Sequence, residues 1–140
     1  MMMDIDPDAE TAIHTATVAA GGVALTPIPF ADSVLLAPIQ ITMIAAIYKA
    51  YDKDIANGVL KGIVTTTFAS SFGSSLAGEL LKFIPGLGSV AGAALNTGVA
   101  VAITEGIGYT VAKSFESGES IDPVELGEII KAAIKSALHQ

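Results

Sequence analysis

Long uncharged segments alternate with short charged ones along this chain. Four runs carry no charged residue, at 11–31, 33–48, 62–78 and 83–104, and the charged segment 49–54 divides them into two pairs. The runs are rich in Ala, Val, Ile, Leu and Gly, and no alternating βαβ pattern appears anywhere. This pattern predicts an all-α fold with a four-helix core made of two helical hairpins.

The first hairpin is expected to turn at its prolines. Helices are predicted over about 8–25 and 32–51, and Pro27 and Pro29 separate them, because proline removes a backbone donor and biases the residue before it away from helix. Pro38 falls in the first two turns of the second helix, so we expect a kink or a short leading turn there.

The second hairpin repeats this scheme. A helix is predicted over about 54–83, with an interruption near Gly73, where the surrounding serines are poor helix formers. Pro85 and Gly86 form the turn, and the next helix runs from about residue 88 to 115.

The two hairpins share sequence as well as pattern. Segment 28–47 aligns without a gap on segment 84–103, which indicates an internal duplication with hairpin repeats over 11–51 and 54–115. The identical pairs are Ile28 and Ile84, Pro29 and Pro85, Ser33 and Ser89, Val34 and Val90, Ala46 and Ala102, and Ile47 and Ile103.

A different kind of helix is predicted at the C-terminus, over 122–140, after a polar linker at 116–121. Asp122 followed by Pro123 is a strong helix start, since aspartate caps the first turn and proline fits its first position. One face is apolar, and the other is acidic early and basic late, as the helix dipole prefers. The apolar face comprises Leu126, Ile129, Ile130, Ala133, Ile134 and Ala137; the polar face holds Glu125, Glu128, Lys131 and Lys135. We expect this helix to cover the core domain over 11–115.

The composition indicates an extensive interface of some kind. Hydrophobic residues make up 51% of the 140 residues but aromatic ones only 6%. Charged residues make up 15%, against roughly 25% in an ordinary soluble domain. A soluble monomer of this composition would expose large apolar patches, so we expect a homo-oligomer, with membrane association as the alternative.

The charge balance narrows the range of partners. The net charge is −7 and no basic cluster exists, so no nucleic-acid partner is expected. Residues 1–10 form an acidic tail where a signal peptide would be positive, and we therefore expect a cytoplasmic protein, with association at the inner membrane as the alternative.

The uncharged stretch 84–104 admits three interpretations. A nucleotide-binding glycine loop needs a preceding strand, whereas a helix is predicted before Gly86. Membrane spans need about 20 strongly apolar residues, and the run 62–78 is dominated by Thr, Ser and Gly. We favour a small-residue helix that lets its neighbours approach closely. The helix-packing residues expected to do so are Gly88, Gly92, Gly98 and Ala102.

No residue pattern points to catalysis. His14 and His139 lack a spaced acid or ligand partner, and Asp4, Asp6 and Asp8 lack the glycine and closing glutamate of a calcium loop. We therefore expect no enzyme and no catalytic, cofactor-binding or metal-binding residue.

Segments 19–52 and 83–115, with their turns "PIPFADS" and "IPGLGS", resemble the bacterial helical domain family of unknown function numbered 697. Its members often follow small Ras-like or Era-like GTPase domains or occur in inner-membrane proteins. The resemblance implies a helical accessory module with a GTPase partner or a membrane partner. This chain has no G-x-x-x-x-G-K-[ST] motif, so any GTPase would be another chain or domain. The favoured function is a non-enzymatic interaction and self-assembly module, and the alternative is a small integral or membrane-remodelling protein.

Overall fold

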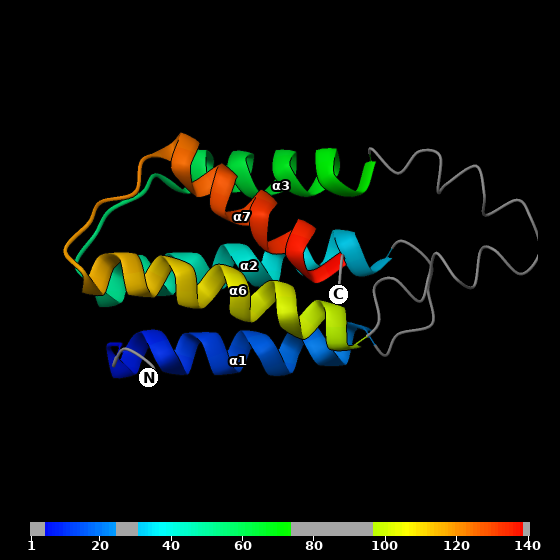
Figure 1. Cartoon of the computed structure of the whole chain (residues 1–140), viewed down its shortest axis with the longest axis horizontal. Coiled ribbons are helices and arrows are strands. Elements are labelled where there is room, and N and C mark those ends of the chain that lie inside the picture. The colour runs from blue at the N-terminus through cyan, green and yellow to red at the C-terminus, as the bar shows by residue number, and fades with distance from the viewer. Residues whose placement is uncertain (1–4, 25–30, 74–96, 139–140) are drawn as a thin grey trace, which may run out of the picture.

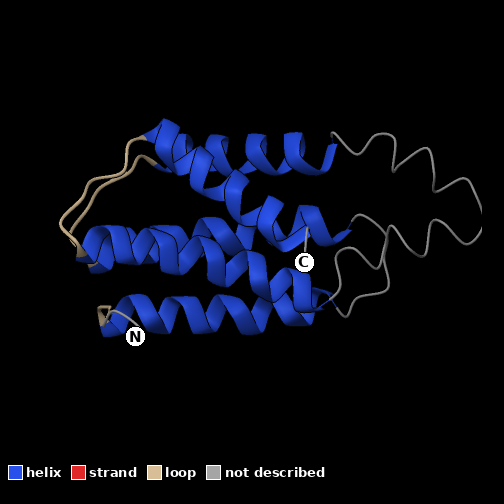
Figure 2. Ribbon diagram, in the orientation of Figure 1, coloured by secondary structure: helices blue, strands red, loops and turns tan. Residues whose placement is uncertain are grey.

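The structure, a computed structural model, describes residues 5–24, 31–73 and 97–138. These residues form helices and connecting loops without any strand (Figure 2), which confirms the all-α prediction. The helices are α1 (Pro7–Ala24), α2 (Ala31–Ala50), α3 (Asn57–Gly73), α6 (Thr97–Glu116) and α7 (Pro123–Leu138).

The helices lie along one long axis in a bundle (Figure 1). Helix α1 packs against both α2 and α6, and α2 also contacts α6 and α3. Helix α7 completes the bundle by packing between α6 and α3. Helices α2 and α6 each touch three other helices and are the central elements of the bundle; for α2 this agrees with its nearly uniform apolar sequence.

Helix α1 begins at Pro7, inside the segment 1–10 that we expected to be an acidic tail. The Asp6 carboxylate accepts a hydrogen bond from the Asp8 backbone N–H at 2.8 Å, and Pro7 occupies the first helical position. Ile5 and Ala9 are buried in the core. The end of the tail is thus part of the bundle, because the pair Asp6-Pro7 is a helix start of the same kind as Asp122-Pro123.

Helix α7 begins where the sequence predicts. The Glu125 backbone N–H donates to the Asp122 carboxylate at 2.8 Å, and the Asp122 N–H donates to the Glu125 carboxylate at 3.3 Å, which is a capping box. The apolar face of α7 is buried through Leu126, Ile130 and Ile134. The C-terminal helix therefore covers the bundle as expected.

Two helices are each followed by a residue with a left-handed backbone conformation. Helix α2 ends before Asp52, whose φ is 56°, and the Lys53 N–H donates to the Tyr48 carbonyl at 2.8 Å. Helix α6 ends before Gly118, whose φ is 84°, and the Glu119 N–H donates to the Ser114 carbonyl at 3.0 Å. Both are Schellman-type caps, in which glycine is the usual left-handed residue.

The structure tests some details of the two expected hairpins and leaves others outside the described residues. Helix α3 starts at Asn57 and not at residue 54. Helix α2 runs through Pro38 from Ala31 to Ala50. The second hairpin turn lies outside the described residues, so the proposed duplication stays a prediction.

Candidate functional site

The core contains a buried polar contact between α2 and α6. The Gln40 side-chain amide donates a hydrogen bond to the Thr104 hydroxyl at 2.9 Å, and that hydroxyl donates to the Ala100 carbonyl at 2.8 Å. Both side chains are fully buried, and the Gln40 carbonyl oxygen has no partner in the described residues. This contact penalises other alignments of the two helices, since a slip would leave the buried Gln40 amide without its partner, whereas Thr104 would keep its bond to Ala100.

An aromatic cluster closes the end of the bundle where α2 and α6 terminate. The Tyr48 ring meets Phe115 edge-on with centroids 4.8 Å apart, and Tyr51 lies against the same ring at 5.7 Å. The Lys53 ammonium sits 5.6 Å from the Phe115 centroid. These contacts fix the C-terminal ends of two helices that run in the same direction.

The two tyrosine hydroxyls of this cluster differ in their bonding. The Tyr51 hydroxyl accepts from the Asp6 backbone N–H and donates to the Glu116 carboxylate, both at 2.8 Å. The Tyr48 hydroxyl is buried and has no partner in the part of the chain that the structure describes. Burial, with smaller effects from the Asp122 and Glu125 charges, raises the pKa of Tyr48. Tyr51 therefore connects three helix ends, whereas Tyr48 contributes through its ring.

The predicted helix-packing residues are placed only in part. Gly98 is exposed in the first turn of α6, and Ala102 is half-buried between α6 and α7. Gly88 and Gly92 lie outside the described residues, as do the predicted turn residues Pro27, Pro29, Pro85 and Gly86.

Two other glycines of α6 make the close helix contacts that the structure describes. A Cβ on Gly106 would lie 3.3 Å from the Ala133 Cβ of α7, and one on Gly108 would lie 2.7 Å from the Ile13 side chain of α1. Gly108 was missed at the sequence level. Its position four residues after Thr104 and four before Ala112 was the available signal, since that spacing defines one helix face.

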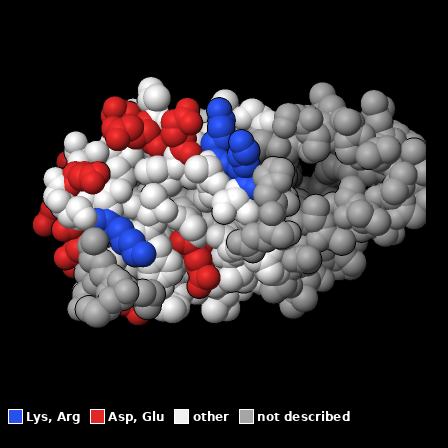
Figure 3. All heavy atoms as spheres, in the orientation of Figure 1, with Lys and Arg blue, Asp and Glu red and all other residues white. Residues whose placement is uncertain are grey.

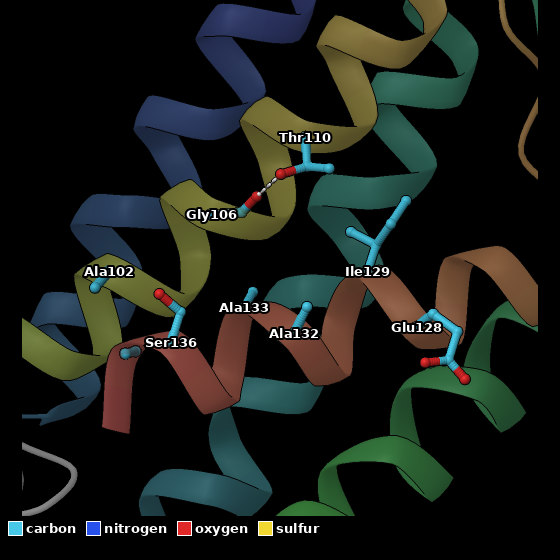
Figure 4. Close-up of a pocket in the computed structure, with 9 residues that line it drawn as sticks. Ala102, Gly106, Thr110, Glu128, Ile129, Ala132, Ala133 and Ser136 are labelled. Carbon is cyan, nitrogen blue, oxygen red and sulfur yellow. Dashed lines mark hydrogen bonds between the residues drawn. The ribbon is translucent and has the colours of Figure 1, made fainter. Parts of the chain in front are cut away.

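Surface grooves follow three of the junctions between the described helices. The α6/α7 groove measures about 430 Å³ and is drawn in Figure 4, where Ala132, Ala133 and Ser136 face Ala102 and Gly106. The Thr110 hydroxyl in this groove donates to the Gly106 carbonyl of its own helix at 2.6 Å. A groove of about 390 Å³ runs between α1 and α2, and one of about 510 Å³ between α3 and α7.

The grooves present mainly small and apolar side chains and few groups that could take part in a reaction. Their walls consist mainly of Ala, Gly, Thr, Ser and Ile side chains. Within 5–24, 31–73 and 97–138 no group of three or more His, Cys, Asp or Glu residues could hold a metal ion. The expectation that His14 lacks an acid partner was wrong: His14 is exposed and its Nε2 lies 3.5 Å from the carboxylate of Glu10, one turn earlier on α1. Such walls suit the faces of other helices or apolar chains.

Charge is distributed unevenly along the bundle axis. The acidic residues of α1 and of the 49–54 and 117–122 connections lie at the end where α3 and α7 begin, and Figure 3 shows acidic side chains gathered there. The helix segments 11–24, 33–48, 62–73 and 97–104 carry no charge and extend toward the opposite end. The fold therefore places four uncharged segments side by side, which their sequence order alone does not require.

In the residues that the structure describes, no helix has the length and apolarity that crossing a membrane requires. No solved structure matches the chain. Over 117 residues the chain is 26% identical to a protein described as Magnetosome membrane protein 22 from Magnetospirillum gryphiswaldense. That alignment covers 81% of this chain and 60% of the relative, so the chain spans less than two thirds of the relative's length.

A protein-family comparison covers nearly the whole chain. Residues 2–139 match the family described as Domain of unknown function (DUF697). This match includes both segments that carry the resemblance noted in the sequence and all five described helices. The chain belongs to the DUF697 family.

Proposed function

We propose that this chain is a non-enzymatic helical module that acts by self-assembly and by contact with partner proteins. The observation that carries the proposal is the surface between the helices, where open grooves are lined by small and apolar side chains. Side chains of this kind let a second helix approach closely and lose little conformational entropy when they are covered. A soluble enzyme would need convergent polar groups in such a groove.

The first test is the mass of the detergent-free chain in solution. Size-exclusion chromatography with light scattering, run over a range of protein concentrations, should give a defined oligomer. A monomer at every concentration would contradict self-assembly.

Membrane association is the second candidate function. Two observations favour it: the relative is described as a magnetosome membrane protein, and four uncharged helix segments lie side by side in the bundle. Helix α7 places Lys131 and Lys135 toward the end of the bundle to which these uncharged segments extend. There the two ammonium groups could meet anionic headgroups at the cytoplasmic face of an inner membrane. Flotation with vesicles of phosphatidylglycerol and phosphatidylethanolamine tests this, and protein that stays at the bottom of the gradient counts against it.

A GTPase partner is a further element of the proposal, and it rests on the family resemblance. The partner would be a separate chain or domain, because this sequence has no phosphate-binding loop motif. Co-purification of a tagged chain from its native cytoplasm and membranes, followed by identification of GTP-binding proteins, tests this element. Recovery of the chain without any such protein would remove it.

A further inference from the structure

Two exposed valines line the groove between α3 and α7. Three large hydrophobic side chains are exposed among the described residues: Val18 on α1, Val59 on α3 and Val124 on α7. Val59 is 43% exposed and Val124 75% exposed, and both line this one groove. Exposed apolar side chains that flank a common hollow indicate a contact surface rather than scattered surface residues.

The α3 side of the groove is open to a closely packed neighbour. Gly58, Gly62, Thr66 and Ser70 follow one another at four-residue spacing along α3, and all line the groove. A Cβ on Gly58 or Gly62 would meet no atom within 4 Å, so no described side chain occupies the space beside these two glycines. The groove measures about 510 Å³.

The order of the charged residues along α7 indicates which partner matches the groove. Glu125 and Glu128 precede Lys131 and Lys135, and all four side chains are exposed. Figure 3 shows acidic side chains at the end where α7 begins and basic ones farther along the same edge. Of these four residues, Glu128 and Lys131 line the groove. When two α7 helices are placed antiparallel about a two-fold axis level with Ile129 and Ile130, Glu128 of each copy faces Lys131 of the other. A parallel arrangement in register would oppose like charges.

We infer that the α3/α7 groove is the self-association surface of this protein, and that two copies pair across it with their α7 helices antiparallel. The pairing is isologous, so each favourable charge pair occurs twice, and the exposed valines are covered in both copies. Opposite charges at the rim set the register, while like charges would repel a shifted or parallel partner. The inference rests on the proposed self-assembly function and names its surface.

Charge-reversal variants test the register directly. Glu128→Lys would oppose Lys131 of the partner subunit, and Lys131→Glu would oppose the partner's Glu128. Each single variant should weaken self-association at least about tenfold, because opposed like charges at an interface are costly. An equimolar mixture of the two variants should recover a heterodimer, since every rim pair is then complementary again.

Glu119→Lys is the matched control, because it changes the net charge as Glu128→Lys does but lies in the exposed loop before α7. Sedimentation velocity of each variant and of the mixture measures the effect, and circular dichroism melting checks that each variant folds. A wild-type oligomer that persists in both single variants would overturn the α3/α7 surface and leave self-assembly intact. A wild-type monomer would instead remove the self-assembly proposal itself.

Discussion

Gly108 of α6 lies against Ile13 of α1 so closely that a Cβ at this glycine would come within 2.7 Å of the Ile13 side chain. The Met43 sulfur of α2 would lie 3.0 Å from the same Cβ. The absence of a side chain at Gly108 is therefore what lets α1, α2 and α6 meet at one level of the bundle.

We expect Gly108→Ala to destabilise the fold by about 1–3 kcal/mol, because the added methyl group overpacks this junction and outweighs the gain in helix propensity. Chemical denaturation followed by circular dichroism measures the change. Gly22→Ala is the control, since a Cβ there meets nothing within 4 Å; this variant should gain up to about 1 kcal/mol. Equal effects of the two substitutions would contradict the close approach.

The Gln40 and Thr104 pair should respond unequally to removal of each partner. Thr104→Val leaves the buried Gln40 amide without a partner and should cost about 1–3 kcal/mol. Gln40→Met removes an amide whose carbonyl oxygen is already unpaired and keeps the Thr104 bond to Ala100, so its cost should be below about 1 kcal/mol. Thermal denaturation of both variants and of the double variant gives the coupling, and the reverse order of the two costs would show that the pair is arranged differently.

The tyrosines at the end of the bundle give a second matched comparison. Tyr51→Phe removes two hydrogen bonds, one from Asp6 and one to Glu116, and should cost about 0.5–1.5 kcal/mol. Tyr48→Phe keeps the ring contact with Phe115 and removes a buried hydroxyl that has no described partner; we expect it to be neutral or slightly stabilising. Urea denaturation of the two variants decides this, and a larger loss for Tyr48→Phe would reveal a partner for its hydroxyl.

Stability should fall at alkaline pH. Burial is the main cause that raises the pKa of Tyr48, Tyr51 and Tyr109 above the ordinary value of 10.0. A pKa that is higher in the folded state stabilises the fold below the unfolded value, and this contribution is lost as the pH rises through the folded value. Tyrosinate absorbance at 295 nm should therefore titrate above pH 10 in the folded protein and lower in denaturant. Coincident curves would refute the shift.

The end of α2 offers a stabilising substitution. Asp52 adopts a φ of 56°. This conformation strains a residue with a Cβ by more than ordering a glycine costs in entropy, so Asp52→Gly should raise stability by about 0.5–1 kcal/mol. Gly118→Ala, at a φ of 84° in the equivalent cap of α6, should lower it by a similar amount. Melting temperatures measured by scanning calorimetry check both signs. If both variants lose stability, the Asp52 side chain contributes more than its strain costs.

Local sequence determined which segments are helical and where several of them begin. Asp122-Pro123 predicts the start of α7 because the capping carboxylate and the proline both act within one turn. The apolar face of α7 was predictable for the same reason, since residues three and four apart share a face on any helix. Asp6-Pro7 carried the same signal and could have placed the start of α1, although the acidic composition of residues 1–10 indicated a tail.

Tertiary structure decided which of the similar apolar faces meet. Gln40 and Thr104 are 64 positions apart, and nothing local pairs them, because several helices offer equivalent small or apolar faces. The same holds for Gly108 with Ile13, and for the alignment of four uncharged segments toward one end of the bundle. Sequence periodicity specifies a face of one helix, but the choice of partner depends on how all five described helices pack together, and that is a property of the whole fold.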